Sequence, residues 1–403
     1  MRDLFRKRRM WRKPGELKDS YDVVIIGAGA HGLATAYYLA QHGITDVAIL
    51  EKSYIGSGAA GRNTTILRSN YKTPEGARFY DASVKLYEGL GAALGFNLLF
   101  SQCGHLTLAH SDRAMFVMAN RAEVNRLEGI DSQLIGPDRV QELAPAMYVG
   151  PDTTYPIMGA LYHPPGGIIR HDAVVWGFAR GADSAGAEIH PYTEVTGLRR
   201  EGDRIAAVET NRGTVKAGTV LNCTAGWSSL IAAMAGVELP ITTHILQACV
   251  TEPVKPFLDV VIVSSQMHVY ISQSDRGEFV MGSEIEPWST YRMQNTLNFL
   301  QDLTRHTLEL FPQLERARLL RAWAGLCDLS PDYSPILGQT EVENFHVSAG
   351  WGTYGFKAAP IVGKTLAELV ASGRTPDLIA PFSLERFYTD ELVSELAAAA
   401  VSH

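Results

Sequence analysis

The chain has 403 residues, of which 46% are hydrophobic and 20% charged, a composition typical of a globular protein with material for one large core or two. No apolar run approaches the roughly 18 residues that a membrane-spanning helix needs, so we expect no membrane span. The four cysteines show no CxxC or Cys/His spacing, so we expect neither a disulfide framework nor a metal site, and we predict a cytoplasmic location.

The net charge of −7 is unevenly distributed along the chain. Residues 1–18 carry a net charge of +6, and subtracting this from −7 leaves −13 for the rest. We therefore interpret residues 1–19 as a basic arm. It contains no apolar signal sequence, and we expect it to stay solvated or to pack on a partner subunit rather than to bind a membrane or nucleic acid.

The first predicted elements are a strand, a helix and a second strand. Residues 21–26 form a continuous apolar run, as in a buried parallel strand. Residues 31–41 have the apolar spacing of a helix that ends near Gly43, and residues 46–52 resume as a strand. This order predicts a βαβ unit.

Three glycines lie between the first strand and the helix in the motif GAGAHG. Gly27 permits a tight turn, Gly29 lets the backbone approach a pyrophosphate, and Gly32 lets the helix and strand pack closely. Glu51 at the end of the second strand is placed to accept hydrogen bonds from a ribose diol. The unit therefore predicts a dinucleotide-binding site.

The rest of the chain also shows the patterns of strands and helices. Residues 74–94 are predicted to be helical and residues 99–111 alternate like a strand. Residues 188–224 contain strand-like runs separated by turn residues, and residues 296–314 form an amphipathic helix. Residues 345–370 again read as a strand, a glycine-rich loop and a helix. The pattern predicts an α/β body interrupted by β-rich insertions.

Two further loops indicate which dinucleotide binds. Residues 56–71 form a second glycine-rich loop that an NAD site does not require. Residues 350–357 form a third, followed by a helix from about Ala358, whose N-terminal dipole suits the negative charge of a reduced flavin. These loops favour FAD and make an NAD-dependent dehydrogenase the weaker interpretation.

Several long motifs resemble those of the β subunit of heterotetrameric sarcosine oxidase and occur in the same order. This family belongs to the glycine-oxidase and D-amino-acid-oxidase-like superfamily of FAD enzymes. The resemblance runs from about residue 21 to residue 403. The motifs are GAGAHGLATAYYLAQHGI, GRNTTILRSNY, RHDAVVWGFARGAD, TEPVKP, YISQSDRGE and GWGTYGFKAAP.

The resemblance implies a discontinuous, Rossmann-like α/β FAD-binding domain of the glutathione-reductase type, with an inserted β-rich α+β substrate domain. Residues 20–403 would form the oxidoreductase unit. Its FAD-binding segments would be about 20–98, 162–235 and 332–403, and its substrate-domain segments about 99–161 and 236–331.

The family's reaction is the oxidative demethylation of an N-methyl amino acid, with non-covalent FAD as the hydride acceptor. A zwitterionic substrate needs cations for its carboxylate, and Arg68 and Lys357 match the family positions that hold it. Tyr270, His268 and Tyr354 are expected to line the substrate pocket. The residues expected to contact FAD are Gly27, Gly29, Ala30, His31, Gly32, Glu51, Lys52, Gly58, Arg62, Asn63, Thr64, Val195, Ala225, Gly226, Gly352, Gly355, Phe356 and Lys357.

His171 lies between Arg170 and Asp172 at the start of a predicted helix. The residues alone explain Asp172 as the N-cap and allow His171 to be merely structural. In the resembling family the histidine of this motif is bonded to FMN, to which electrons pass at the interface with a larger α subunit. The resemblance thus implies a covalent FMN at His171, and further small subunits.

Three departures from the family pattern leave alternatives open. Tyr354 and Gly355 replace a glycine pair, CTAGWSS carries Trp227, and the stretch HPPGG before His171 lacks arginines. A flavin subunit of an N-methylglutamate dehydrogenase, or a proline-type dehydrogenase that passes electrons to another acceptor, therefore remains an alternative. A non-catalytic flavin subunit for electron transfer or assembly is an alternative of another class.

Overall fold

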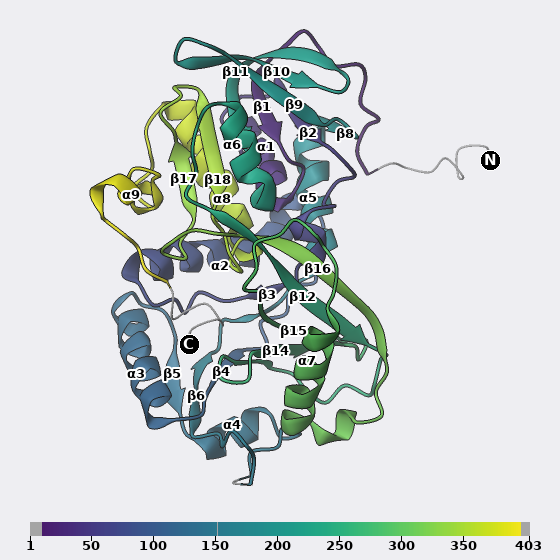
Figure 1. Ribbon diagram of the computed structural model, residues 1–403, viewed down its shortest axis with the longest axis vertical. Coiled ribbons are helices and arrows are strands. Elements are labelled where there is room, and N and C mark those ends of the chain that lie inside the picture. The colour runs from purple at the N-terminus through teal and green to yellow at the C-terminus, as the bar shows by residue number, and fades with distance from the viewer. Residues whose placement is uncertain (1–9, 151, 396–403) are drawn as a thin grey trace, which may run out of the picture.

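The computed structural model describes residues 10–150 and 152–395. Within these ranges the chain forms two eight-stranded sheets, which occupy the upper and lower halves of Figure 1, and a two-stranded ribbon. Among the described residues, no helix combines the length and the apolar character that crossing a bilayer requires.

The upper sheet contains the predicted βαβ unit, which is confirmed. Strand β1 pairs in parallel with β2 on one side and with β11 on the other. Alternate residues of β1 face two cores: Val23 and Ile25 face one, and Val24 and Ile26 face the other. The strands are β1 (Ser20–Ile26), β2 (Val47–Glu51), β8 (Glu188–Pro191), β9 (Val195–Glu201), β10 (Arg204–Thr210), β11 (Gly213–Asn222), β17 (Ile336–Gln339) and β18 (Phe345–Ala349).

Helices cover both faces of this sheet, as a mostly parallel sheet requires. Helices α1, α5 and α8 pack around the first core and α6 around the second. A Cβ on Gly363 of α8 would lie 2.6 Å from Ala34 of α1, so glycine permits their close approach. These helices are α1 (Ala30–Gln41), α5 (His171–Ser184), α6 (Ser228–Met234) and α8 (Ala359–Ser372).

The lower sheet is largely antiparallel. Helix α7 packs Phe299, Leu303 and Leu310 against one face, which confirms its predicted amphipathic character. Its strands, in sheet order, are β16 (Leu319–Leu329), β12 (Thr242–Thr251), β15 (Phe279–Ile285), β14 (Val269–Gln273), β13 (Val261–Ser264), β4 (His105–Ala109), β6 (Gly159–His163) and β5 (Gln133–Ile135). The neighbouring helices are α3 (Asp112–Leu127), α4 (Pro137–Leu143) and α7 (Leu297–Leu310).

Helix α2 (Pro74–Leu94) lies where the two halves meet, and its bounds are those predicted. The small ribbon pairs β3 (Ile66–Leu67) with β7 (Gly167–Ile168), and α9 (Arg386–Thr389) follows near the end of the described chain. The strands of the upper sheet come from three separate stretches of sequence, as expected for an interrupted α/β body. The exact segment boundaries stay a prediction.

The start of α5 differs from the prediction. The helix begins at His171, so Arg170 rather than Asp172 occupies the N-cap position. Asp172 instead lies in the first turn, where its carboxylate accepts the N–H of Ala173 at 2.9 Å. A carboxylate in this turn still stabilises the positive end of the helix dipole, which explains the acid without a capping role.

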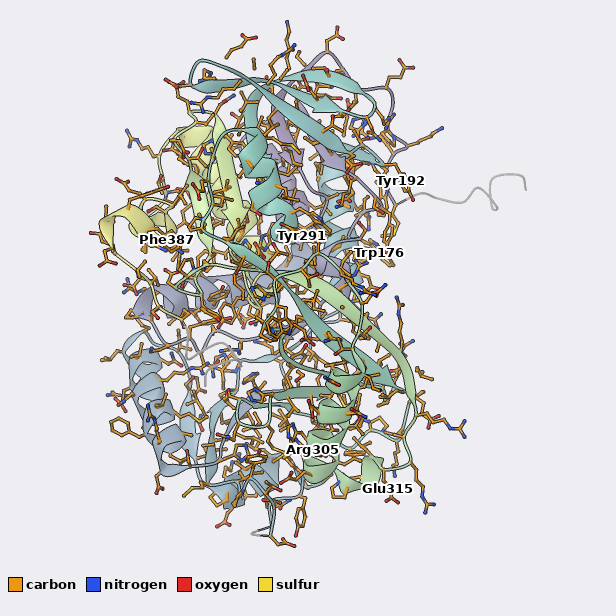
Figure 2. The ribbon with its side chains drawn as sticks, viewed as in Figure 1. Trp176, Tyr192, Tyr291, Arg305, Glu315 and Phe387 are labelled. Carbon is orange, nitrogen blue, oxygen red and sulfur yellow. The ribbon has the colours of Figure 1, made fainter. Side chains whose placement is uncertain are left out.

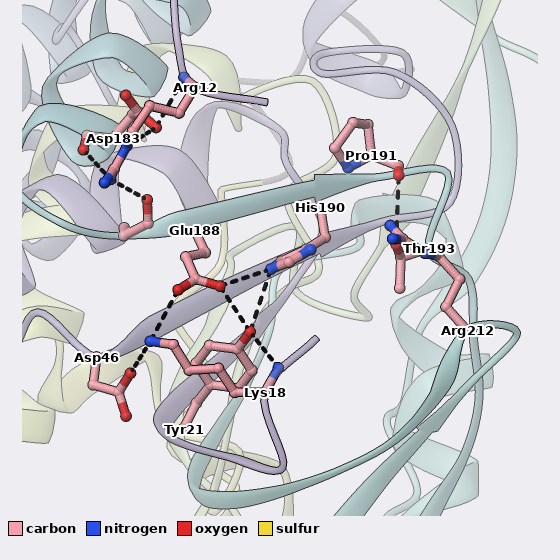
Figure 3. A network of polar contacts seen from close by, with 11 residues as sticks. Arg12, Lys18, Tyr21, Asp46, Asp183, Glu188, His190, Pro191, Thr193 and Arg212 are labelled. Atoms are coloured by element: carbon pink, nitrogen blue, oxygen red, sulfur yellow. Dashed lines mark hydrogen bonds and ion pairs between the residues drawn. The ribbon is translucent and has the colours of Figure 1, made fainter. Parts of the chain in front are cut away.

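The described part of the basic arm contacts the chain itself (Figure 3). Arg12 forms an ion pair with Asp183 at 3.1 Å, and Lys18 pairs with Asp46 at 2.8 Å and Glu188 at 2.9 Å. The side chains of Arg12 and Lys18 nevertheless stay 62% and 50% exposed, and packing of the arm on a partner subunit stays a prediction. Residues 1–9 of the predicted arm lie outside the described residues.

Candidate functional site

A cleft lies between the two halves of the molecule and is lined by residues of both. One end is lined by the glycine turn after β1 and by Glu51, and the other by Lys357 and by Tyr270 of the lower sheet. The cleft contains about 2180 Å³ of space free of atoms, part of it open to solvent. The residues that line it come from both halves, from the glycine turn after β1 to Tyr270 of β14, so a ligand that fills it contacts both sheets.

The glycine turn fits a pyrophosphate. A Cβ on Gly27, where φ is +106°, would lie 2.5 Å from the Cys223 carbonyl oxygen, and one on Gly32 would lie 2.1 Å from that of Gly27. A Cβ on Gly29 would meet no atom within 4 Å, so this backbone is open to an approaching ligand. Gly29 caps α1 without a side-chain hydrogen bond, which leaves the helix N-terminus available to phosphate oxygens.

Glu51 is held at the end of β2 with its carboxylate at the cleft. One carboxylate oxygen accepts the N–H of Ala28 at 3.1 Å, and the other accepts the N–H of Ser53 at 2.9 Å and the hydroxyl of Ser57 at 3.2 Å. These bonds fix the acid beside the glycine turn, as the predicted ribose contact requires. Its neighbour Lys52 lies 3.5 Å from the ring centre of Trp227.

His31 ties the glycine turn to the loop before α8. Its Nε2 lies 2.7 Å from the carbonyl oxygen of Gly355, and its Nδ1 lies 3.0 Å from the hydroxyl of Ser348. Burial lowers the pKa of His31 to about 4, so the ring is neutral near pH 7. A neutral ring matches these partners if Nε2 donates to the carbonyl and Nδ1 accepts from the hydroxyl.

Two buried basic side chains, Arg68 and Lys357, also line the cleft. Arg68, just after β3, donates to the Asn70 side-chain oxygen at 3.1 Å and lies 4.6 Å from the ring centre of Tyr71. Lys357 lies in the turn before α8, and its pKa is held well below the usual value, first by burial and then by Arg68 and Arg121. This concentration of positive charge is suited to a carboxylate ligand.

Most residues predicted for the site line this cleft. The structure brings together Gly27, Gly29, Ala30, His31, Glu51, Lys52, Gly58, Arg62, Asn63, Thr64, Arg68, Val195, Ala225, Tyr270, Gly352, Gly355, Phe356 and Lys357.

Four of the other predicted residues do not line the cleft. Gly32 and Gly226 face neighbouring protein atoms. Tyr354 turns into the core, where its ring packs edge-on against Tyr71 with a ring-centre distance of 5.2 Å. His268 lies in the turn before β14. Lys357, three residues after Tyr354, lines the cleft, and its Nζ lies 5.5 Å from the centre of the Tyr354 ring, so Tyr354 packs behind the cleft wall.

Sequence reasoning missed Asp328 and His105, which also line the cleft. Asp328 accepts the N–H of Gly350 at 2.7 Å, and burial raises the pKa of its carboxyl to about 6. His105 is the first residue of β4. The alternating pattern predicted a strand there but did not indicate which face would meet the cleft.

His171 lies outside the set of residues that line the cleft. It is partly buried at the start of α5, and burial lowers the pKa of its imidazole, so the ring is neutral near pH 7. Trp176 of the same helix is 38% exposed and lies on the outside of the molecule near the junction of the two halves (Figure 2).

A mostly parallel sheet, an open glycine turn, an acid at the end of the second strand and a long cleft together define a dinucleotide-binding oxidoreductase. The chain belongs to the FAD dependent oxidoreductase family, whose model matches residues 22–369, and FAD is therefore its cofactor.

Comparison with individual proteins identifies the chain more specifically than the family does. The chain is 46% identical to the sarcosine oxidase subunit beta of Arthrobacter sp, covering 98% of this chain and 97% of that one, and 45% identical to that of Rhodobacter capsulatus, covering 98% and 94%. The resemblance predicted from the motifs is thus confirmed. Among solved structures, L-proline dehydrogenase from P. horikoshii superposes with a TM-score of 0.88 at 31% identity, covering 94% of this chain and 100% of that one.

Proposed function

We propose that this chain oxidises the secondary amine of an N-methyl amino acid. The observation that carries the proposal is that Arg68 and Lys357, two buried cations, line the same cleft as the dinucleotide-binding residues Gly29 and Glu51. The carboxylate of an amino acid is the kind of anion that two adjacent basic side chains bind. The similarity to sarcosine oxidase β subunits supports the same class of substrate.

The protein's contribution to this reaction is positioning. FAD supplies the hydride acceptor when it is bound. Arg68 would hold the substrate carboxylate by its rigid guanidinium, and the incoming negative charge would favour the protonated form of Lys357. Because both side chains are buried, water is largely excluded around the carboxylate, which strengthens these contacts. Fixed orientation of the amine against the acceptor then lowers the barrier.

A cyclic secondary amine is the second candidate substrate. The solved structure of L-proline dehydrogenase matches nearly the whole chain at 31% identity, and proline presents the same carboxylate and secondary amine. An N-methylated acidic amino acid, as in the N-methylglutamate alternative, would need a further cation for its second carboxylate.

Anaerobic mixing of the purified full complex with substrate tests the proposal. We expect N-methylglycine, N-methylglutamate or proline to bleach the visible absorbance of the oxidised flavin, whereas dimethylamine, which has no carboxylate, should not. The absorbance spectrum after mixing is the measurement. An unbleached flavin with every secondary amino acid in the panel would instead favour the electron-transfer or assembly subunit.

We also propose that His171 carries a covalent FMN at an interface with a larger α subunit of a complex that includes small subunits. Support comes from the resemblance to heterotetrameric sarcosine oxidase, from the neutral, partly buried imidazole and from its place outside the FAD cleft. A neutral imidazole is a competent nucleophile near pH 7. The predicted cytoplasmic location remains a prediction.

The mass of the denatured chain tests the FMN bond. We expect the chain from the native complex to exceed the polypeptide mass by one FMN, with the flavin on the peptide that contains His171. The His171→Ala variant should lose this increment, and the control His42→Ala, at an exposed histidine, should keep it. A bare polypeptide mass in the native complex would refute the bond.

A further inference from the structure

His105 lines the cleft with no protein partner to explain its burial. Its side chain is 1% exposed, and among the described residues neither ring nitrogen has a hydrogen-bond partner. The other histidine that lines the cleft, His31, has both ring nitrogens bonded. An unpaired buried polar group costs about 1–3 kcal/mol, so an imidazole kept in this state indicates a ligand that completes its hydrogen bonds.

The register of the lower sheet directs His105 toward the substrate end. His105 pairs with Val261 of β13, and two residues further along the same face Thr107 pairs with Val263. Val263 in turn pairs with Tyr270, and both line the cleft. Because strand residues two apart share a face, His105 lies on the face of the sheet that forms the cleft wall.

The charges around His105 keep its ring neutral. Its pKa is held well below the usual value, first by burial and then by Arg68, His163, Arg121 and Lys357. A neutral imidazole has one N–H donor and one bare nitrogen acceptor. The cations that would hold the carboxylate therefore leave His105 with a lone pair to offer.

A bound amino acid presents one group that needs such an acceptor. With its carboxylate held by Arg68 and Lys357, a secondary amine that has released its ammonium proton to solvent has one N–H and one lone pair. A hydrogen bond from that N–H fixes the amine and leaves the nitrogen lone pair free, as oxidation of the adjacent C–H bond requires. A neutral tertiary amine has no N–H to donate.

We propose that a ring nitrogen of His105 accepts the N–H of the substrate amine, and so favours secondary over tertiary amines. This inference rests on the proposed function, because it takes a carboxylate-bearing amine as the ligand. His105 would act by binding and orienting the substrate, and no proton needs to be transferred to it.

Anaerobic titration of the full complex tests this role with two probes of similar shape. N-methylglycine has an N–H, whereas (methylthio)acetate places a thioether sulfur at the same position. For His105→Leu we expect the affinity for N-methylglycine to fall about ten-fold and the affinity for the thioether to change less than about two-fold. The dependence of the flavin reduction rate on concentration gives the affinity for N-methylglycine, and the absorbance shift of the still oxidised flavin gives the affinity for the thioether. His105→Asn, which keeps a hydrogen-bond acceptor, should recover part of the loss.

Selectivity provides the second measurement. The preference for N-methylglycine over N,N-dimethylglycine in flavin reduction should fall about ten-fold in His105→Leu. Thr107→Val changes a buried residue on the same face of β4 that does not line the cleft, and should leave both measurements unchanged.

Two results would overturn the role of His105. These are equal weakening of both probes in His105→Leu, and an unchanged preference between the two amines. Failure of the proposed function looks different, because wild-type flavin would then remain oxidised with every secondary amino acid.

Discussion

Replacing Arg68 with alanine should raise the substrate concentration for half-maximal flavin reduction about a hundred-fold or more, and Lys357→Ala should act in the same direction. Both side chains are buried at the cleft, so each variant removes a desolvated partner of the substrate carboxylate. The flavin spectrum should stay intact, because neither substitution changes the glycine turn or Glu51. The dependence of the anaerobic flavin reduction rate on N-methylglycine concentration measures the change.

Two exposed basic residues provide control positions for these substitutions. Lys364 lies on α8 and Arg113 on α3, and both are exposed. Lys364→Ala and Arg113→Ala should leave the titration unchanged. If Arg68→Ala and Lys357→Ala also leave it unchanged, the carboxylate site is elsewhere and the proposed substrate class loses its structural support.

The second large effect concerns stability. Arg386 and Asp332 form a buried ion pair with side chains 1% and 0% exposed and an Nε to Oδ2 distance of 2.8 Å. We expect Arg386→Met to reduce the free energy of unfolding by about 3–5 kcal/mol, because Asp332 would keep its buried charge without a partner. Denaturant unfolding of the FAD-loaded protein measures this loss.

A second substitution separates charge from packing in this pair. Adding Asp332→Asn to Arg386→Met should restore part of the stability, because the uncompensated charge is removed. The control Arg374→Met, at an exposed position, should change stability by less than about 0.5 kcal/mol. Equal stability of the single and double variants would show that lost packing, and not the isolated charge, causes the effect.

The same ion pair fixes the end of the described chain near the substrate site. Asp332 accepts the N–H of Val393 through its carboxylate at 3.1 Å and that of Glu395 through its carbonyl at 3.0 Å. The Glu395 carboxylate in turn accepts the N–H of Thr73, just before α2, at 2.8 Å. Nothing in the sequence around Glu395 indicated this contact, because it joins residues more than three hundred positions apart.

Local patterns predicted much of the fold. The apolar run of residues 21–26, the glycines of GAGAHG and Glu51 all lie within one short stretch, so their spacing predicted the βαβ unit and a dinucleotide-binding site. The bounds of α2 followed from helical periodicity in the same way. Such patterns are local because strand and helix periods repeat over a few residues.

The sequence by itself, through its glycine spacing, Glu51 and its long motifs, determined an FAD-binding α/β protein related to sarcosine oxidase β subunits. Only the tertiary structure decided which side chains reach the cleft. It turned Tyr354 into the core while Lys357 lines the cavity, and it brought His105 to the same cleft as Arg68. The physical reason is that turn geometry and sheet register fix the direction of a side chain, and both depend on packing between distant segments.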